Sequence, residues 1–403
     1  DAGYRTPEEV EEWKNRSPIT KLREYLISER LAPEEELARV EAEVEAEVDD
    51  ARQFSTSSPW PDPATVLDHV YSAYKGEIMR ELTFSTATRE ALTEEMERDP
   101  AVFVMGEGIG ERGGNWGTTV GLFERFGPMR LRDTPIVERG FTGLCTGAAL
   151  VGGRPVVDFM FLDFLLDGMG EIINQTAKLQ YMSNGRLTMP IVFRGCIGVG
   201  HSAATHHSGN YYPMLAHVPG LRVVVPSSPY DAKGLLKTAI RSNDPVFFLE
   251  HKSVLGVKGQ VPDDEYLIPF GEAAVVREGR DATVVAIGWM VHQTLKACDE
   301  LAKDGVSIEV IDPRTISPLD TDTMLASVKK TGRLLIVDED YGPCSVGAEI
   351  AAQVTAKGFD DLDAPIMRIN GAFTPVPYAP PLEAAVVPNP TSIALAIRDL
   401  LAE

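Results

Sequence analysis

Short runs of valine and isoleucine alternate with helix-like stretches from about residue 80 to the end of the chain. The first runs lie at 102–105, 155–157, 191–193, 221–225 and 246–249, and four more at 283–287, 308–311, 334–337 and 366–369. Such runs are typical of parallel strands that are buried on both faces and joined by helices. A loop at 258–269, rich in Asp, Gly and Pro, separates the two sets. The pattern predicts an α/β protein with two doubly wound domains, at 76–262 and 263–403.

The first 75 residues follow a different pattern. After Pro33, apolar residues recur at steps of three and four, at Leu37, Val40, Val44 and Val48, with acidic residues between them. This spacing is typical of a helix with one narrow apolar stripe. The prolines at 59, 61 and 63 then predict an extended connector over 55–63. Residues 1–75 are therefore expected to form a helical segment with a linker.

Composition excludes several function classes. The 403 residues include 60 acidic and 38 basic side chains, a net charge of −22, which repels nucleic-acid phosphates and anionic lipids. The four cysteines have no CxxC spacing, which favours a reducing compartment. No apolar run approaches the roughly 18 residues needed to span a bilayer, and no signal-peptide pattern is present. We expect a cytoplasmic protein that binds neither nucleic acid nor membrane.

The stretch 133–143 (DTPIVERGFTG) contains the first candidate catalytic residue, Glu138. The pattern predicts a short β-branched strand that ends with this carboxylate and turns at Gly140 into a helix rich in Ala and Gly. A carboxylate held in an apolar crevice loses hydration, which raises its pKa and lets it exchange a proton near neutral pH. On spacing alone, an ion pair between Glu138 and a nearby arginine is an equally good interpretation.

A second candidate is the histidine-rich segment 201–212, which holds three of the seven histidines among small and polar residues. Segments of this kind are typical of functional loops. A metal site would need further ligands at supporting spacing, so proton transfer by one imidazole is the better interpretation. His217, which has apolar neighbours, is expected to be structural.

Two other motifs are less specific. The run 158–164 (DFMFLDF) mainly predicts core packing, although one ring at the end of the strand could stack on a planar cofactor. The glycine cluster 106–114 lacks the full GxGxxG register, and its two acids would oppose a pyrophosphate. We therefore do not expect a dinucleotide site there.

Several motifs, taken in order, resemble the β subunit of the thiamine-diphosphate-dependent first component of 2-oxo acid dehydrogenase complexes, the pyruvate and branched-chain family. They are 133–140, 158–164, 217–221, 226–235 (PSSPYDAKGL), 311–320 (IDPRTISPLD), 330–334 and 374–383 (TPVPYAPPLE). Residues 1 to about 72 are similar to the C-terminal tail of that family's α subunit. The resemblance implies a transketolase-like fold, with a pyrimidine-binding domain followed by a transketolase C-terminal-type domain. It also leads us to expect one piece of a fused polypeptide.

The resemblance implies roles for four residues. Glu138 matches the glutamate that hydrogen-bonds N1′ of the cofactor's pyrimidine and drives it to the imino tautomer, so that the 4′-amino group can deprotonate the thiazolium. Phe164 falls at the position of the ring that stacks on the pyrimidine. His207, rather than His206, aligns with the histidine that handles the substrate carboxylate and acyl transfer to lipoyl. Glu107 aligns with a carboxylate near the active-site entrance.

The resemblance also implies two metal ions. Potassium would be held by main-chain carbonyls beneath the active-site loops, at Ile191, Ala239, Ile240, Ser242 and Asp244. The family's α subunits bind Mg2+ and the diphosphate with a Gly-Asp-Gly motif and paired asparagines, which this sequence lacks. The Mg2+ ion and the diphosphate are therefore expected to bind an α part. The expected working unit is an α2β2 assembly or a dimer of the fused chain, which acts with a lipoylated acyltransferase core.

Departures from the family pattern leave the substrate open. Residues 209–214 (GNYYPM) replace the frequent QSPEAF, and Asp167 stands where glutamine is common. Pyruvate and branched-chain 2-oxo acids fit equally. An acetoin dehydrogenase with the same cofactor and subunit plan is the closest enzymatic alternative. A catalytically silent assembly module is the alternative from another class, and a transketolase-type sugar enzyme fits less well.

Overall fold

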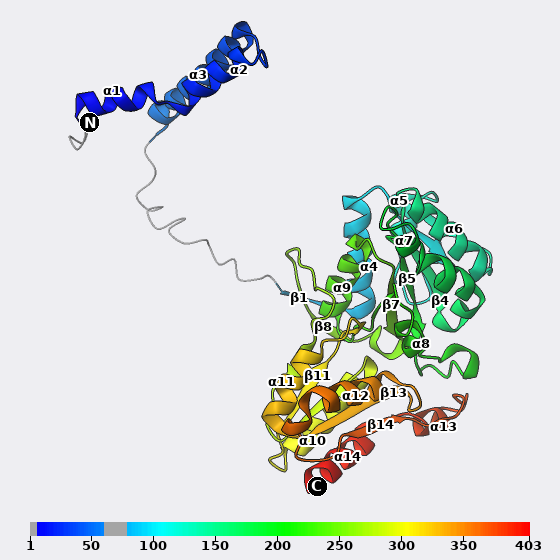
Figure 1. The fold of residues 1–403 in the computed structure, drawn as a ribbon. Coiled ribbons are helices and arrows are strands. Elements are labelled where there is room, and N and C mark those ends of the chain that lie inside the picture. The colour runs from blue at the N-terminus through cyan, green and yellow to red at the C-terminus, as the bar shows by residue number, and fades with distance from the viewer. Residues whose placement is uncertain (1–5, 60–78) are drawn as a thin grey trace. The chain divides into compact units, whose positions relative to one another are not determined.

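The computed structural model describes residues 6–59 and 79–403, and the chain divides into one unit up to Lys75 and a second from Gly76 (Figure 1). The first unit contains α1 (Pro7–Asn15), α2 (Pro18–Ser28) and α3 (Glu34–Ser57). Arg23 of α2 lies 3.7 Å from Glu34 and 3.7 Å from Glu41, which joins α2 to α3.

The predicted amphipathic helix corresponds to α3. Along its apolar stripe, Val40, Val44 and Val48 are 46%, 53% and 61% exposed, so this part of the stripe is not buried within the first unit. The helix continues to Ser57, beyond the start of the predicted connector, and residues 60–63 of that connector lie outside the described residues. Among the helices that the structure describes, none combines the length and apolar composition needed to cross a bilayer.

The second unit contains a seven-stranded sheet with the strand order β12-β6-β7-β5-β4-β2-β3. Neighbouring strands are parallel, except that the edge strand β12 runs antiparallel to β6. The strands are β2 (Val102–Gly106), β3 (Leu131–Asp133), β4 (Arg154–Phe161), β5 (Val192–Ile197), β6 (Arg222–Val224), β7 (Val246–His251) and β12 (Thr315–Ser317). Because β12 comes from the later part of the chain, the two predicted domains share this sheet.

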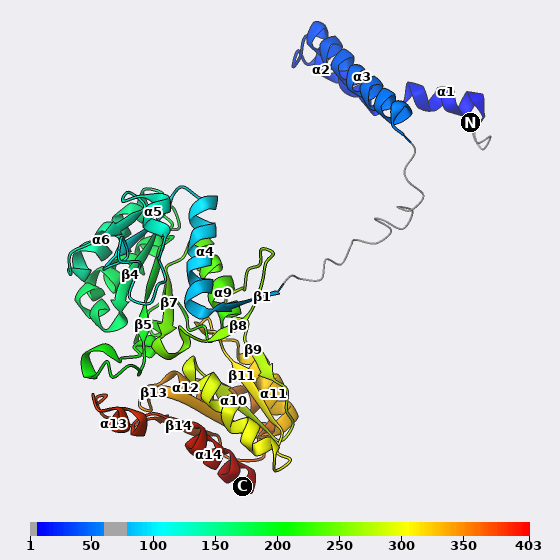
Figure 2. The same cartoon turned by 180° about the vertical axis from the view of Figure 1, so that it is seen from behind.

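Helices cover both faces of this sheet, and α4 and α9 lie side by side (Figures 1 and 2). The α-helices are α4 (Phe84–Arg98), α5 (Leu122–Phe126), α6 (Glu138–Leu150), α7 (Leu179–Met182), α8 (Tyr212–Ala216) and α9 (Pro229–Arg241). The shorter 3-10 and π segments are η2 (Leu162–Gly168), η3 (Gly170–Thr176), η4 (Thr205–His207) and η5 (Lys252–Val254).

A second sheet of five strands has the order β14-β13-β10-β11-β9, with only β9 antiparallel to its neighbour. Its strands are β9 (Ala274–Arg277), β10 (Ala282–Ala286), β11 (Ile308–Asp312), β13 (Leu334–Tyr341) and β14 (Met367–Gly371). Helices pack around it (Figure 2): α10 (Trp289–Ala302), α11 (Thr321–Thr331), α12 (Val346–Gly358), η6 (Phe359–Asp361), α13 (Pro380–Ala385) and α14 (Pro390–Ala402).

The prediction of an α/β fold with two mainly parallel sheets is confirmed. A small antiparallel pair, β1 (Met79–Thr83) and β8 (Lys258–Pro262), was not predicted. Strand β8 falls within the stretch expected to be a loop. Its sequence, KGQVP, has no apolar run, because only its last two residues are buried.

Candidate functional site

The four predicted active-site residues follow four neighbouring parallel strands. Glu107 comes directly after β2, Glu138 after β3, Phe164 after β4 and His207 after β5, and these strands are adjacent in the order β5-β4-β2-β3. The carboxyl ends of parallel strands meet at one edge of a sheet, which is where open α/β sheets bind their ligands. The fold therefore brings residues that are 100 positions apart in the sequence to the same edge.

Glu138 is buried, with 6% of its surface exposed. The expectation that it ends a strand is wrong, because β3 already ends at Asp133 and Glu138 is the first residue of α6. Pro135 contributes to this early end, since it has no N–H for the strand ladder. Within the described residues Glu138 forms no ion pair with an arginine, so the structure does not support that alternative.

Glu107 is the neighbour of Glu138 and is equally buried. Burial, followed by repulsion from the carboxylates of Glu138 and Asp158, raises the pKa of Glu107 to about 7. One of its oxygens, Oε1, is buried and accepts no hydrogen bond from any residue that the structure describes. Glu107 can therefore gain or lose a proton near neutral pH beside Glu138.

The imidazole of His207 packs between two aromatic rings. Its ring centroid lies 4.6 Å from that of Phe161 and 5.4 Å from that of Phe164, with the rings at 73° and 79° to each other. Phe164 remains 36% exposed, so part of its ring is free to stack on a planar group. The neighbouring His206 is exposed, which agrees with the preference for His207.

Two functional groups near His207 were missed by the sequence analysis. Lys252, whose pKa is lowered by burial, donates a hydrogen bond from Nζ to the carbonyl of His207. Asp163 accepts hydrogen bonds from the Gly209 N–H (3.0 Å) and from the Tyr211 hydroxyl (3.4 Å). The polar triplet Glu250-His251-Lys252, which follows the apolar run 246–249, was the signal that could have identified Lys252.

The glycine cluster at 106–114 binds the carboxylate of Asp133, which follows it in the sequence. The backbone N–H groups of Ile109 and Gly110 both donate to Oδ1 of Asp133, at 2.6 and 3.1 Å. Backbone amides occupied in this way are not free to cradle a pyrophosphate. Two amides of the cluster are therefore already occupied, which does not favour a dinucleotide site there.

The five positions predicted to hold potassium gather at the amino ends of β5 and β7 and at the end of α9. This is the opposite edge of the sheet from the strand ends that precede Glu138 and His207, and potassium binding there stays a prediction. The carbonyls of Ile240 and Ser242 accept hydrogen bonds from the guanidinium of Arg154, at 3.0 and 2.6 Å. Each oxygen keeps a second lone pair, so a cation can still be accommodated, with Arg154 as its competitor.

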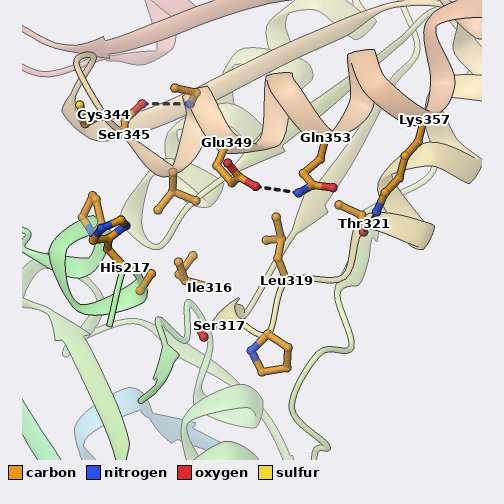
Figure 3. A pocket seen from close by; sticks show the side chains of 15 residues that line it. His217, Ile316, Ser317, Leu319, Thr321, Cys344, Ser345, Glu349, Gln353 and Lys357 are labelled. Atoms are coloured by element: carbon orange, nitrogen blue, oxygen red, sulfur yellow. Dashed lines mark hydrogen bonds between the residues drawn. The ribbon is translucent and has the colours of Figure 1, made fainter. Parts of the chain in front are cut away.

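Other parts of the described chain offer no comparable site. No group of three or more His, Cys, Asp or Glu side chains within residues 6–59 and 79–403 is arranged to bind a metal ion. A cavity of about 740 Å³ lies between α8, β12 and α12, lined by His217, Ser317 and Glu349 among others (Figure 3). It contains none of the predicted active-site residues.

Together, the fold and the site define a transketolase-like protein with a buried glutamate at the carboxyl edge of its first sheet. Residues 80–258 match the family "Transketolase, pyrimidine binding domain" and residues 271–393 match "Transketolase, C-terminal domain". Residues 1–64 match "Dehydrogenase E1 component". A solved structure, "Split gene transketolase, inactive beta4 tetramer", superposes with a TM-score of 0.66 at 19% identity over 80% of this chain and 98% of that one, which shows the fold alone.

Closer relatives identify the family. The chain is 46% identical to the acetoin:2,6-dichlorophenolindophenol oxidoreductase β subunit of Cupriavidus necator, over 79% of this chain and 97% of that protein. It is 44% identical to the 2-oxoisovalerate dehydrogenase β subunit of Bacillus subtilis, over 80% and 99%. Against the pyruvate dehydrogenase E1 component β subunit of Rickettsia felis the identity is 46%, over 79% and 98%. The chain belongs to the E1 β-subunit family of thiamine-diphosphate-dependent dehydrogenases and is part of an oxidoreductase.

Proposed function

We propose that this chain forms the β half of an active site that decarboxylates a 2-oxo acid and passes the acyl group to the lipoyl group of an acyltransferase. The observation that carries the proposal is the meeting of Glu107, Glu138, Phe164 and His207 at the carboxyl edge of one sheet. Glu138 is buried there among acids, and Phe164 keeps an open ring face. This arrangement fits a pyrimidine ring that must be stacked on one side and hydrogen-bonded at a ring nitrogen.

Each residue has a separate task in this proposal. Thiamine diphosphate, when bound, supplies the nucleophilic carbon and the electron sink for decarboxylation. Glu138 holds a proton at N1′ of the pyrimidine, and the poorly solvated site keeps that hydrogen bond strong. Phe164 orients the pyrimidine by stacking, and His207 faces the substrate carboxylate. Glu107, with its pKa of about 7, supplies or accepts protons beside Glu138.

The other half of the site comes from an α part in this proposal. The sequence has no Gly-Asp-Gly motif with paired asparagines, so Mg2+ and the diphosphate would be held by an α subunit or by the α part of a fused chain. The match of residues 1–64 to the dehydrogenase E1 component supports a close link between the two parts. An α2β2 assembly is the working unit that we propose.

A substrate panel tests the proposed function. With the α part present, we expect turnover of pyruvate or 2-oxoisovalerate, measured by reduction of 2,6-dichlorophenolindophenol. Preferred turnover of acetoin would instead favour the second candidate, an acetoin dehydrogenase, which the relative in Cupriavidus necator supports. Comparable inactivity on all three substrates would contradict both enzymes and favour the assembly module.

The potassium site is a separate proposal, supported by the resemblance and by the gathering of its five positions at one edge of the sheet. A cation that binds only the folded state, at ten times its Kd, raises the free energy of unfolding by about 1.4 kcal/mol. We therefore expect a melting temperature roughly 2–4 °C higher in KCl than in NaCl of equal ionic strength. Equal melting temperatures in the two salts would contradict the site.

A further inference from the structure

Residues 198–212, which we call the histidine loop, hold His207 in a strained backbone. The non-glycine residues with positive φ are His201 (61°), Ser202 (53°), Ala204 (61°) and Tyr211 (26°). Residues other than glycine rarely adopt positive φ, and each one costs on the order of 1–3 kcal/mol. Such a conformation persists only when surrounding contacts fix it.

One of the contacts that fix the loop comes from the second sheet. Glu339, on β13, is buried, and its Oε1 accepts a hydrogen bond from the backbone N–H of Val199 at 2.7 Å. The same oxygen accepts a longer one, 3.4 Å, from the side-chain amide of Asn210. Val199 and Asn210 lie near the two ends of the histidine loop, so a single carboxylate holds both ends.

The other oxygen of Glu339 is held by His251, at the end of β7. Nε2 of His251 lies 2.8 Å from Oε2 of Glu339, and both side chains are almost fully buried. The backbone N–H of Ser253 donates to Nδ1 of His251 at 3.1 Å. Because Nδ1 must accept this hydrogen bond, the proton of a neutral imidazole is on Nε2 and is donated to Glu339.

Glu339 thus accepts from three donors, which requires its ionised form. Burial opposes ionisation, but His251 and the hydrogen bonds from Val199 and Asn210 outweigh it and hold the pKa of Glu339 below its ordinary value. The close approach also explains Gly198, where a Cβ would lie 2.0 Å from Nε2 of His251 and 2.7 Å from Oε1 of Glu339.

We propose that Glu339 is a positioning residue for His207: its carboxylate, on the C-terminal domain, holds both ends of the histidine loop and so helps to set the place of the imidazole. The inference rests on the role of His207 in the proposed function. Two further hydrogen bonds also fix the histidine loop. Lys252 donates to the His207 carbonyl, and the Tyr212 hydroxyl donates to Asp338, the residue before Glu339.

The Glu339→Gln variant tests this role, because the amide has nearly the same shape but cannot accept from every donor. In one orientation its NH2 group faces the Nε2–H of His251, and in the other it faces the N–H of Val199. Moving the His251 proton from Nε2 to Nδ1 does not restore the hydrogen bonding, because the Nδ1–H would then face the N–H of Ser253. In both orientations two N–H donors face each other, so we expect the side chain at position 339 to shift and the histidine loop to be held less firmly.

With the α part present, we expect kcat of Glu339→Gln to fall on the order of 10- to 100-fold, as displacement of a reacting group predicts. Affinity for thiamine diphosphate should stay within about tenfold of wild type, because Glu138 lies on another element, α6. In a Glu339→Gln, His207→Ala double variant, turnover should match that of His207→Ala alone, since both changes remove the same function. A multiplicative loss, or wild-type turnover in Glu339→Gln, would overturn the proposal.

A measurement without substrate separates this inference from the proposed function. Hydrogen exchange should become faster in 198–212 of the Glu339→Gln protein and stay unchanged in 133–143. Glu349→Gln is the matched control, because Glu349 is exposed in the same domain and hydrogen-bonds only Gln353. If Glu339→Gln fails to fold, Asn210→Ala removes one loop contact without stranding a buried charge, and should accelerate exchange in the same segment. Unchanged exchange there would refute the positioning role even if turnover confirms the enzyme.

Discussion

Replacing Glu138 with glutamine should reduce kcat by a factor on the order of 10³–10⁴, the range expected when a positioned proton donor or acceptor is lost. Glutamine keeps the size of the side chain but has no carboxyl proton to hold at the pyrimidine nitrogen. Because Glu138 is buried, solvent cannot replace the missing proton easily. Steady-state turnover with the α part present and a saturating 2-oxo acid measures the effect.

Binding provides the control for this variant. Affinity for thiamine diphosphate should stay within about tenfold of wild type, or about 1.4 kcal/mol, because stacking and diphosphate binding remain. The matched variant Glu124→Gln changes an exposed glutamate in the first turn of α5 and should leave turnover unchanged. Calorimetry on this chain without the α part should detect no tight cofactor binding. Wild-type-like turnover in Glu138→Gln would end the catalytic assignment.

The second large effect is on stability. Replacing Glu250 with alanine should lower the free energy of unfolding by about 3–5 kcal/mol, the usual cost of leaving one buried charge without its partner. Arg194 is 1% exposed and donates to Oε2 of Glu250 from Nε at 2.9 Å and from the terminal nitrogen at 2.5 Å. Without Glu250, the nearest carboxylate is that of Asp158, at 3.6 Å.

Urea unfolding measures this loss as a lower midpoint with little change in slope. Glu300→Ala is the matched control, because its ion pair with Lys303 on α10 is exposed and such pairs contribute little. Its midpoint should be close to that of wild type. A Glu250→Ala protein as stable as this control would show that Arg194 finds another partner or reaches water.

The sequence was most informative where strands are buried on both faces. Strands such as β5 (Val192–Ile197) and β7 (Val246–His251) are buried along their whole length, so their apolar runs identify them. The edge strand β8 was missed because only its last two residues are buried, which leaves no continuous apolar run. The edge strand β9 was also missed, and none of its residues is buried. The short β-branched strand predicted to end at Glu138 does not form as predicted, because β3 ends at Asp133 and Pro135 has no N–H for the strand ladder.

In the candidate site, too, the sequence identified some residues and missed others. The local pattern selected Glu138 and the histidine-rich segment as candidates, whereas Phe164 and the choice of His207 over His206 came from the resemblance to a known family. Glu339 could not be selected, because its partners Val199 and His251 are 140 and 88 positions away in the sequence. Only the folded chain shows that an acid on the second sheet reaches the loop of the first.

The position of β12 has a consequence for how this architecture can be divided. Thr315 and Ser317 of this strand pair with Val224 and Val223 of β6, at the outer edge of the first sheet. A truncated protein ending before residue 263 would leave the backbone amides and carbonyls of β6 bare, and bare strand edges recruit other chains. A first domain expressed without β12 is therefore expected to associate with other chains through the exposed edge of β6.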